Sequence, residues 1–155
     1  MLKLFKIAIF TMVIFMYSSG YSALKFAERL EEYVLPNGLK VILIEDKRSP
    51  SVINSIWYRV GSSYETPGVK GISHVLEHMM FKGTQNYSSG EFSSIIKNMG
   101  GTENGFTSKD YTGYYQKIHK SNLEKCIELE ADRMKNLKFN DNEISSEIEV
   151  VKEER

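Results

Sequence analysis

The sequence is poor in several features that would place a small protein in a class at once. It has a single cysteine, Cys126, among 155 residues, so an internal disulfide framework is excluded. Its 20 basic and 20 acidic residues cancel, whereas nucleic-acid-binding proteins normally show a basic excess. We therefore expect no nucleic acid among the partners. What remains is the composition of an ordinary globular domain, with 41% hydrophobic and 26% charged residues.

The sequence also lacks an apolar run long enough to span a membrane comfortably. Its longest run, Ile7 to Tyr17, falls short of the roughly 20 apolar residues that a spanning helix needs. Lys3 and Lys6 precede the run and the small-residue segment SSGYSA follows it, which is typical of a secretory signal peptide. We predict a signal peptide over residues 1–23, a periplasmic or secreted protein, and no stable membrane span after cleavage. An uncleaved N-terminal anchor is the alternative.

After residue 23 the pattern alternates between strand-like and helix-like segments. A Pro-Asn-Gly turn at residues 36–38 predicts a hairpin between the first two strands. The expected strands cover residues 31–35, 39–45, 51–61, 102–108 and 111–118, and the expected helices cover 69–81, 90–99, 121–135 and 141–155. This order predicts an α+β fold, with helices packed on one side of an antiparallel or mixed sheet.

The segment GISHVLEHMMFKGT, residues 71–84, places two histidines and a glutamate within five positions of an otherwise apolar stretch. On a helix of 3.6 residues per turn, His74, Glu77 and His78 share one arc of about 100°. Imidazoles at positions i and i+4 are neighbours on a helix surface and can direct two nitrogens at one cation. Zinc accepts such nitrogen ligands, and Glu77 is placed to take a proton from water. The alternative interpretation is a solvated helix face with incidental histidines.

A third ligand is expected from the last helix. His119 is the only other histidine, and its setting between lysines indicates an exposed strand end. Glu147 and Glu154 lie about 20° apart on the helical wheel, on the face that also carries Val150 and Val151. An unpaired charge on an apolar face is unfavourable, and a bound cation would resolve the conflict.

Together these segments resemble the M16 metallopeptidases, the group of pitrilysin, insulinase and the mitochondrial processing peptidase, which carries the reversed motif H-x-x-E-H. LPNGLKVIL, WYRVGSSYE, GISHVLEHMMFKGT, GGTENGFTSKDYTGYY and ADRMKNLKF all look like blocks of this family, in the family's order. The resemblance implies zinc as the cofactor, with His74, His78 and Glu154 as its ligands. It implies Glu77 as the catalytic base and Glu147 as a residue that supports the ligands.

The family pattern also implies a substrate-binding role for Asn104, on an exposed strand that pairs with the backbone of the substrate. A purely structural role for Asn104 as a turn residue is the alternative. The family often has alanine where this chain has Gly105, and a glycine would loosen the strand.

The resemblance implies a function and its limits. We predict a zinc-dependent metalloendopeptidase that hydrolyses peptide bonds of polypeptides through a zinc-bound water. The alternative is a catalytically silent partner subunit that only helps to hold the substrate. Because family members have two related halves around a chamber, the expected partners are a polypeptide substrate and a second M16 half, on the same chain or a partner subunit. Residues 24–155 are then the incomplete N-terminal part of the catalytic domain, inactive as an isolated fragment.

Overall fold

The computed structural model describes residues 29–154, so the predicted signal peptide, residues 1–23, lies outside the described residues. The chain divides into two units, one ending at Ser49 and the next beginning at Pro50. Within residues 29–154, no helix combines the length and the apolar character needed to cross a membrane.

The first unit contains a β-hairpin. Its strands β1 (Leu30–Val34) and β2 (Lys40–Ile44) pair antiparallel along their whole length. In the turn, the backbone N–H of Gly38 donates to the carbonyl of Leu35 at 2.8 Å. Gly38 has φ 84°, a conformation that a residue without a Cβ adopts at little cost. The hairpin predicted from Pro-Asn-Gly is confirmed.

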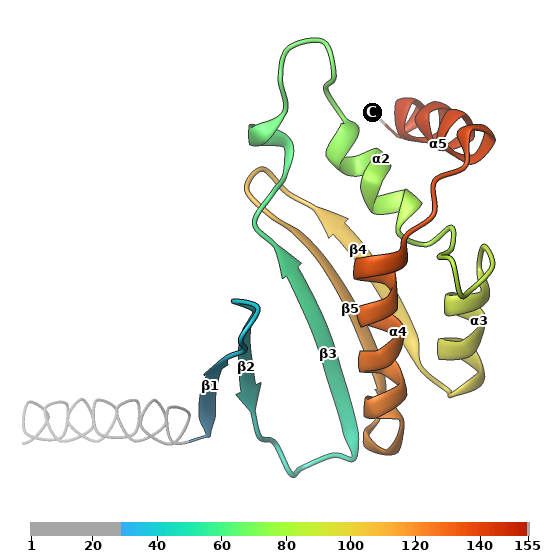
Figure 1. Cartoon of the computed structure of the whole chain (residues 1–155). Helices are drawn as coiled ribbons and strands as arrows, with labels where there is room; N and C mark the ends of the chain where they lie inside the picture. Colours follow the sequence, from blue (N-terminus) through green and yellow to red (C-terminus); the bar gives the residue numbers. More distant parts are fainter. Residues whose placement is uncertain (1–28, 155) are drawn as a thin grey trace, which may run out of the picture. The chain divides into compact units, whose positions relative to one another are not determined.

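The second unit is built on a three-stranded antiparallel sheet. Its strands are β3 (Ser51–Tyr58), β4 (Thr102–Thr107) and β5 (Thr112–His119), in the spatial order β3-β5-β4. The central strand β5 pairs with both neighbours and is the most buried of the three. Figure 1 shows the long β4–β5 hairpin beside β3.

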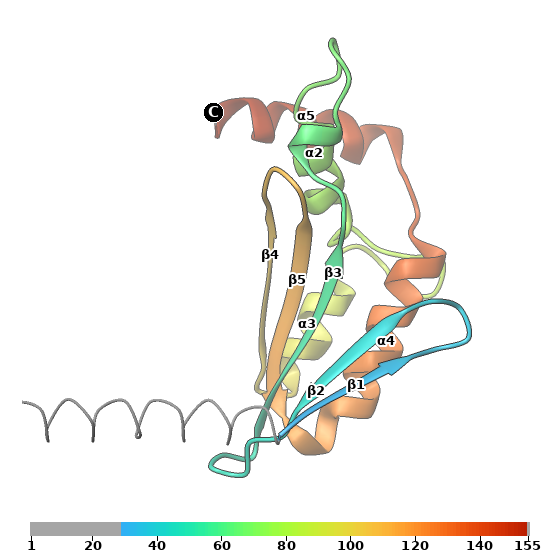
Figure 2. The same ribbon diagram turned by 90° about the vertical axis from the view of Figure 1, so that its left-hand side faces the viewer.

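Helices cover one face of this sheet. The helical elements are η1 (Ser62–Tyr64), α2 (Ile72–Met79), α3 (Glu91–Asn98), η2 (Lys120–Asn122), α4 (Leu123–Asn136) and α5 (Asp141–Glu153). The core lies where α3 and α4 meet β5, and it consists of Phe92, Ile96, Ile118, Cys126 and Leu129. Figure 2 shows both helices on the same side of the strands. The predicted α+β class with an antiparallel sheet is confirmed.

Two helices begin two or three residues later than the sequence pattern predicts. Helix α2 begins at Ile72, because Gly71 before it has φ 95° and cannot be part of a right-handed helix. Helix α4 begins at Leu123, because the 3-10 turn η2 precedes it. These shifts leave the predicted ligands on their expected helices. Helix α5 packs across α2 (Figures 1 and 2), and this contact builds the site.

Candidate metal centre

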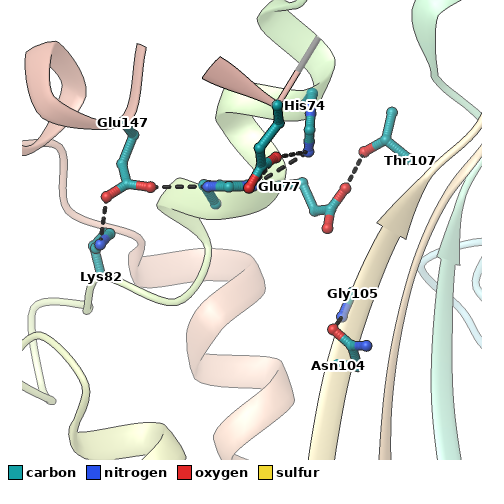
Figure 3. Close-up of polar contacts among 9 residues, drawn as sticks. His74, Glu77, Lys82, Asn104, Gly105, Thr107 and Glu147 are labelled. Atoms are coloured by element: carbon teal, nitrogen blue, oxygen red, sulfur yellow. Dashed lines mark hydrogen bonds and ion pairs between the residues drawn. The ribbon is translucent and has the colours of Figure 1, made fainter. Parts of the chain in front are cut away.

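Three side chains of metal-ligand type converge from α2 and from the end of α5. His74 Nε2 and His78 Nε2 lie 3.2 Å apart. Glu154 Oε2 lies 3.3 Å from His74 Nε2 and 3.7 Å from His78 Nε2. The side chains of His74 and Glu154 are 36% and 48% exposed, so the group opens to solvent. Figure 3 shows these polar contacts.

Local helix geometry accounts for this convergence within each element. His74 and His78 are one turn apart on α2, so their rings lie on the same face. Helix α5 starts at a side-chain cap, because Asn140 Oδ1 accepts the N–H of Asn142 at 2.9 Å. From that start, Glu147 and Glu154 follow two turns apart and both face α2. Glu154 is the residue that ends the helix.

The donor set fits a zinc ion. His78 Nδ1 lies 2.8 Å from a carboxylate oxygen of Glu147, and because a carboxylate only accepts, the neutral ring carries its proton on Nδ1. Nε2 of His78 then presents a lone pair toward His74 and Glu154. Two nitrogens bound tetrahedrally at 2.0–2.1 Å from one zinc would be about 3.3 Å apart. The 3.2 Å separation of the two Nε2 atoms is close to that value.

Glu147 is held between the side chains of Lys82 and His78. It is 8% exposed, its Oε1 accepts from Lys82 Nζ at 2.6 Å, and its Oε2 faces His78. Burial raises the pKa of the Glu147 carboxyl, but the hydrogen bonds from Lys82 and His78 and the charge of Lys82 outweigh it, so its pKa lies below the usual 4.5. Glu147 is therefore ionised at neutral pH and fixes the His78 ring. The sequence interpretation did not include Lys82, although its place one turn after His78 was an available signal.

Glu77 lies on the side of α2 that faces β4 (Figure 3). It is 8% exposed, and its Oε2 accepts from Thr107 Oγ1 at 2.5 Å. Thr107 ends β4, so the sheet orients the carboxylate. A Cβ on Gly105 would lie 3.2 Å from Glu77 Oε1, so the missing side chain leaves room for that second oxygen. Thr107 was not predicted from the sequence, because its role depends on how β4 packs against α2.

A pocket of about 350 Å³ opens beside His74. Its lining includes Glu65, Lys70 and Thr107, so it is bounded by the end of β4 and by the loop before α2. The group of ligand-type atoms therefore has space next to it for a bound molecule.

Comparison with known proteins identifies the family. The model of the insulinase family, peptidase family M16, matches residues 40–155. The chain belongs to the M16 peptidase family. The zinc protease PqqE of Helicobacter pylori is 41% identical over 134 residues, which are 86% of this chain and 30% of that protein. A crystal structure of a protease from Helicobacter pylori aligns with a TM-score of 0.78 and 40% identity, over 81% of this chain and 30% of that chain.

Another relative is named as a subunit of a complex and not as a protease. Subunit 1 of the human cytochrome b-c1 complex is 33% identical over 129 residues, which are 83% of this chain and 27% of that protein. This M16 chain therefore spans about 30% of the length of these two relatives.

Two of the residues weighed from the sequence lie apart from the ligand group. In this M16 chain Asn104 is exposed on β4, and its Oδ1 accepts the N–H of Gly105 at 2.9 Å (Figure 3). Because side chains alternate across a strand and the side-chain direction of Gly105 faces Glu77, Asn104 points to the other face. Its role in binding substrate stays a prediction. His119 ends β5, where its Nδ1 lies 2.8 Å from Ser121 Oγ.

Proposed function

We propose that this chain carries the zinc site and the catalytic carboxylate of a metalloendopeptidase. The observation that supports this proposal most is the convergence of one atom each from His74, His78 and Glu154 within 4.8 Å of one another. The second supporting observation is that Glu77 projects from the same helix, next to the two histidines. Membership in a peptidase family and the similarity to a named zinc protease agree with it.

In this proposal His74, His78 and Glu154 hold the zinc ion, and Glu147 keeps the His78 ring in the tautomer that presents Nε2. A zinc ion supplies a Lewis acid that polarises a peptide carbonyl and lowers the pKa of water from 15.7 toward about 7. The protein contributes the orientation of the ligands and the carboxylate that moves the proton.

Glu77 is the proton carrier. Its Oε2 is engaged by Thr107 at 2.5 Å, so Oε1 is the atom that accepts a proton from the attacking water. As the carbon–nitrogen bond breaks, the protonated Glu77 donates that proton to the leaving amine, and the carboxylate returns to its starting state. Among the described strands β4 lies at an edge of the sheet, where its backbone groups can pair with an extended polypeptide.

The whole protein is proposed to contain more than this chain shows. A second M16 half, on the same chain or on a partner subunit, would complete the chamber around the substrate. The relative from the cytochrome b-c1 complex is named as a subunit, which agrees with the second arrangement. We also propose export through the predicted signal peptide, and N-terminal sequencing of the mature protein tests this by showing whether it begins near Ala23.

The competing function is that of a catalytically silent subunit. Its support is the 33% identity to a cytochrome b-c1 complex subunit. Against it stands the complete set of ligand-type groups, together with Glu77. Metal analysis of the purified full-length protein separates the two, because a silent subunit would contain no stoichiometric zinc.

The test of the mechanism is Glu77→Gln in the full-length protein. We expect zinc to be retained while hydrolysis of an unstructured polypeptide falls by about 10²- to 10⁴-fold, the usual contribution of a general acid–base group. Glu149→Gln is the matched control, because Glu149 is 70% exposed on α5 and pairs only with Lys152 in the described contacts. Unchanged hydrolysis in Glu77→Gln would refute the role of this carboxylate.

A further inference from the structure

The segment Gly61–Glu65 follows β3 and is fixed to the β4–β5 turn. The backbone N–H of Ser63 donates to the carbonyl of Lys109 at 2.8 Å, and the hydroxyl of Ser63 donates to the same carbonyl at 2.7 Å. A Cβ on Gly61 would lie 2.2 Å from the carbonyl oxygen of Ser108, so only glycine permits this close approach. The segment is therefore anchored to the sheet at the end where Thr107 holds Glu77.

The last residue of this segment, Glu65, holds the start of α2. Its Oε2 accepts the N–H of Gly71 at 2.7 Å, and its Oε1 accepts the N–H of Ser73 at 2.9 Å. The first N–H groups of a helix have no partners within the helix, and Gly71 has no side chain with which to cap them. The Glu65 carboxylate does so from outside, with its negative charge at the positive end of the helix dipole.

This cap matters for the site because α2 is short. The helix has 8 residues, too few to be stable without external support. His78 is fixed through its ring by Glu147. His74 lies in the first turn, directly after Ser73, so the position of its ring depends on the order of that turn.

We infer that Glu65 is a positioning residue for the metal centre: by holding the first turn of α2 against the β4–β5 turn, it places His74 beside His78 and Glu154. This inference rests on the proposed function, since it assigns Glu65 a role in zinc affinity. Glu65 itself lies outside the group of ligand-type atoms.

The test uses Glu65→Gln in the full-length protein. Glutamine has the same shape but one acceptor oxygen, so one of the two N–H groups loses its partner. We expect the zinc dissociation constant, measured by competition with a chromogenic chelator, to rise about 10-fold, the lower end of the effect of residues that orient ligands. In the metal-free protein we expect faster amide hydrogen exchange over residues 71–75.

The matched control is Glu91→Gln. Glu91 is the first residue of α3, and its Oε2 accepts the N–H and the O–H of Ser88 at 2.8 and 2.6 Å, so it too is a glutamate at a helix start whose carboxylate accepts two hydrogen bonds. Its helix, α3, carries none of the site residues. We expect wild-type zinc affinity in this variant. An equal loss of affinity in both variants would overturn the inference, because it would reflect general destabilisation.

The outcomes also separate this inference from the proposed function. If the wild-type protein binds no zinc, the proposed function fails, and hydrogen exchange alone then decides the role of Glu65 as a cap. If wild type binds zinc and Glu65→Gln binds it equally well, the inference fails and the proposed function stands.

A second variant, Ser63→Ala, tests the inference if Glu65→Gln does not fold. It removes only the hydroxyl contacts to Lys109 and Asp110. We expect it to weaken zinc binding by a smaller factor, and unchanged binding would overturn the inference.

Discussion

Replacing Glu147 by glutamine should weaken zinc binding without removing a proposed ligand. The carboxylate bonds His78 Nδ1 at 2.8 Å and Lys82 Nζ at 2.6 Å, one with each oxygen. A glutamine in the same place has one acceptor oxygen, so it can serve His78 or Lys82 but not both. It also removes the negative charge that favours a proton on Nδ1 and a lone pair on Nε2.

Burial decides the size of this effect. An exposed ion pair contributes about 0–1 kcal/mol, whereas a hydrogen bond to a charged group away from solvent contributes about 1.5–3 kcal/mol. The Glu147 side chain is 10% exposed, so the second class applies. Loss of such a partner of a metal-bound histidine lowers metal affinity about 10- to 100-fold, equivalent to about 1.4–2.7 kcal/mol. The two estimates agree.

The measurement is the zinc dissociation constant of the full-length protein by chelator competition, with Glu149→Gln as the exposed control on the same helix. Lys82→Met removes the second partner of Glu147 and should cost less, because His78 keeps its acceptor. The double variant Glu147→Gln/Lys82→Met should cost less than the sum of the single variants, since they share one hydrogen bond. A zinc affinity of Glu147→Gln within twofold of wild type would refute the reasoning, and additive losses would refute the shared contact.

Of three further predictions, the first concerns the site and the other two concern charged side chains on β4 and α4. Thr107→Val removes the hydroxyl that holds Glu77, so kcat should fall about 10-fold or more with zinc retained; unchanged kcat would contradict this orientation. Burial raises the pKa of the Glu103 carboxyl above 4.5, although Ser93 and Arg133 lower it in part. The stability that Glu103 contributes is thus present below pH 4.5 and lost as the pH rises through its higher folded pKa. In urea unfolding, the free energy of unfolding of Glu103→Gln minus that of wild type should therefore be more positive at pH 7 than at pH 4. An equal difference at the two pH values would contradict this sign. Arg133 is 1% exposed and bonds Glu130 at 2.7 Å, so Arg133→Met should lower the free energy of unfolding by about 3–5 kcal/mol. Glu130→Met/Arg133→Met should recover most of that loss, and no recovery would contradict the pairing.

Local periodicity was sufficient to find the candidate ligands on each helix. The spacing of His74, Glu77 and His78 places them on one face wherever the segment is helical, because the helical repeat is fixed by the backbone. The same repeat sets Glu147 and Glu154 on one face of α5. The hairpin at Pro36-Asn37-Gly38 and the α+β class were predicted for the same reason, since turn chemistry and alternation are local properties.

Contacts between distant segments could not be predicted in this way. His78 and Glu147 are 69 residues apart in the sequence and Thr107 is 30 residues from Glu77, so their pairing depends on how α5 and β4 pack against α2. Thr107 was missed because a threonine at a strand end carries no periodic signal. Lys82 lies one turn after His78, but its partner Glu147 is on a distant helix, so the pairing itself could not be predicted.

The sequence by itself determined which residues share a face of each helix and, through its family blocks, the peptidase family to which the chain belongs. Only the tertiary structure decided that the face of α5 meets the face of α2, that the carboxylate of Glu65 caps the helix with the histidines, and that Asn104 points away from Glu77. The physical reason is that helix and strand repeats are fixed within a few residues, whereas the meeting of two faces depends on burial and hydrogen bonding across the whole unit.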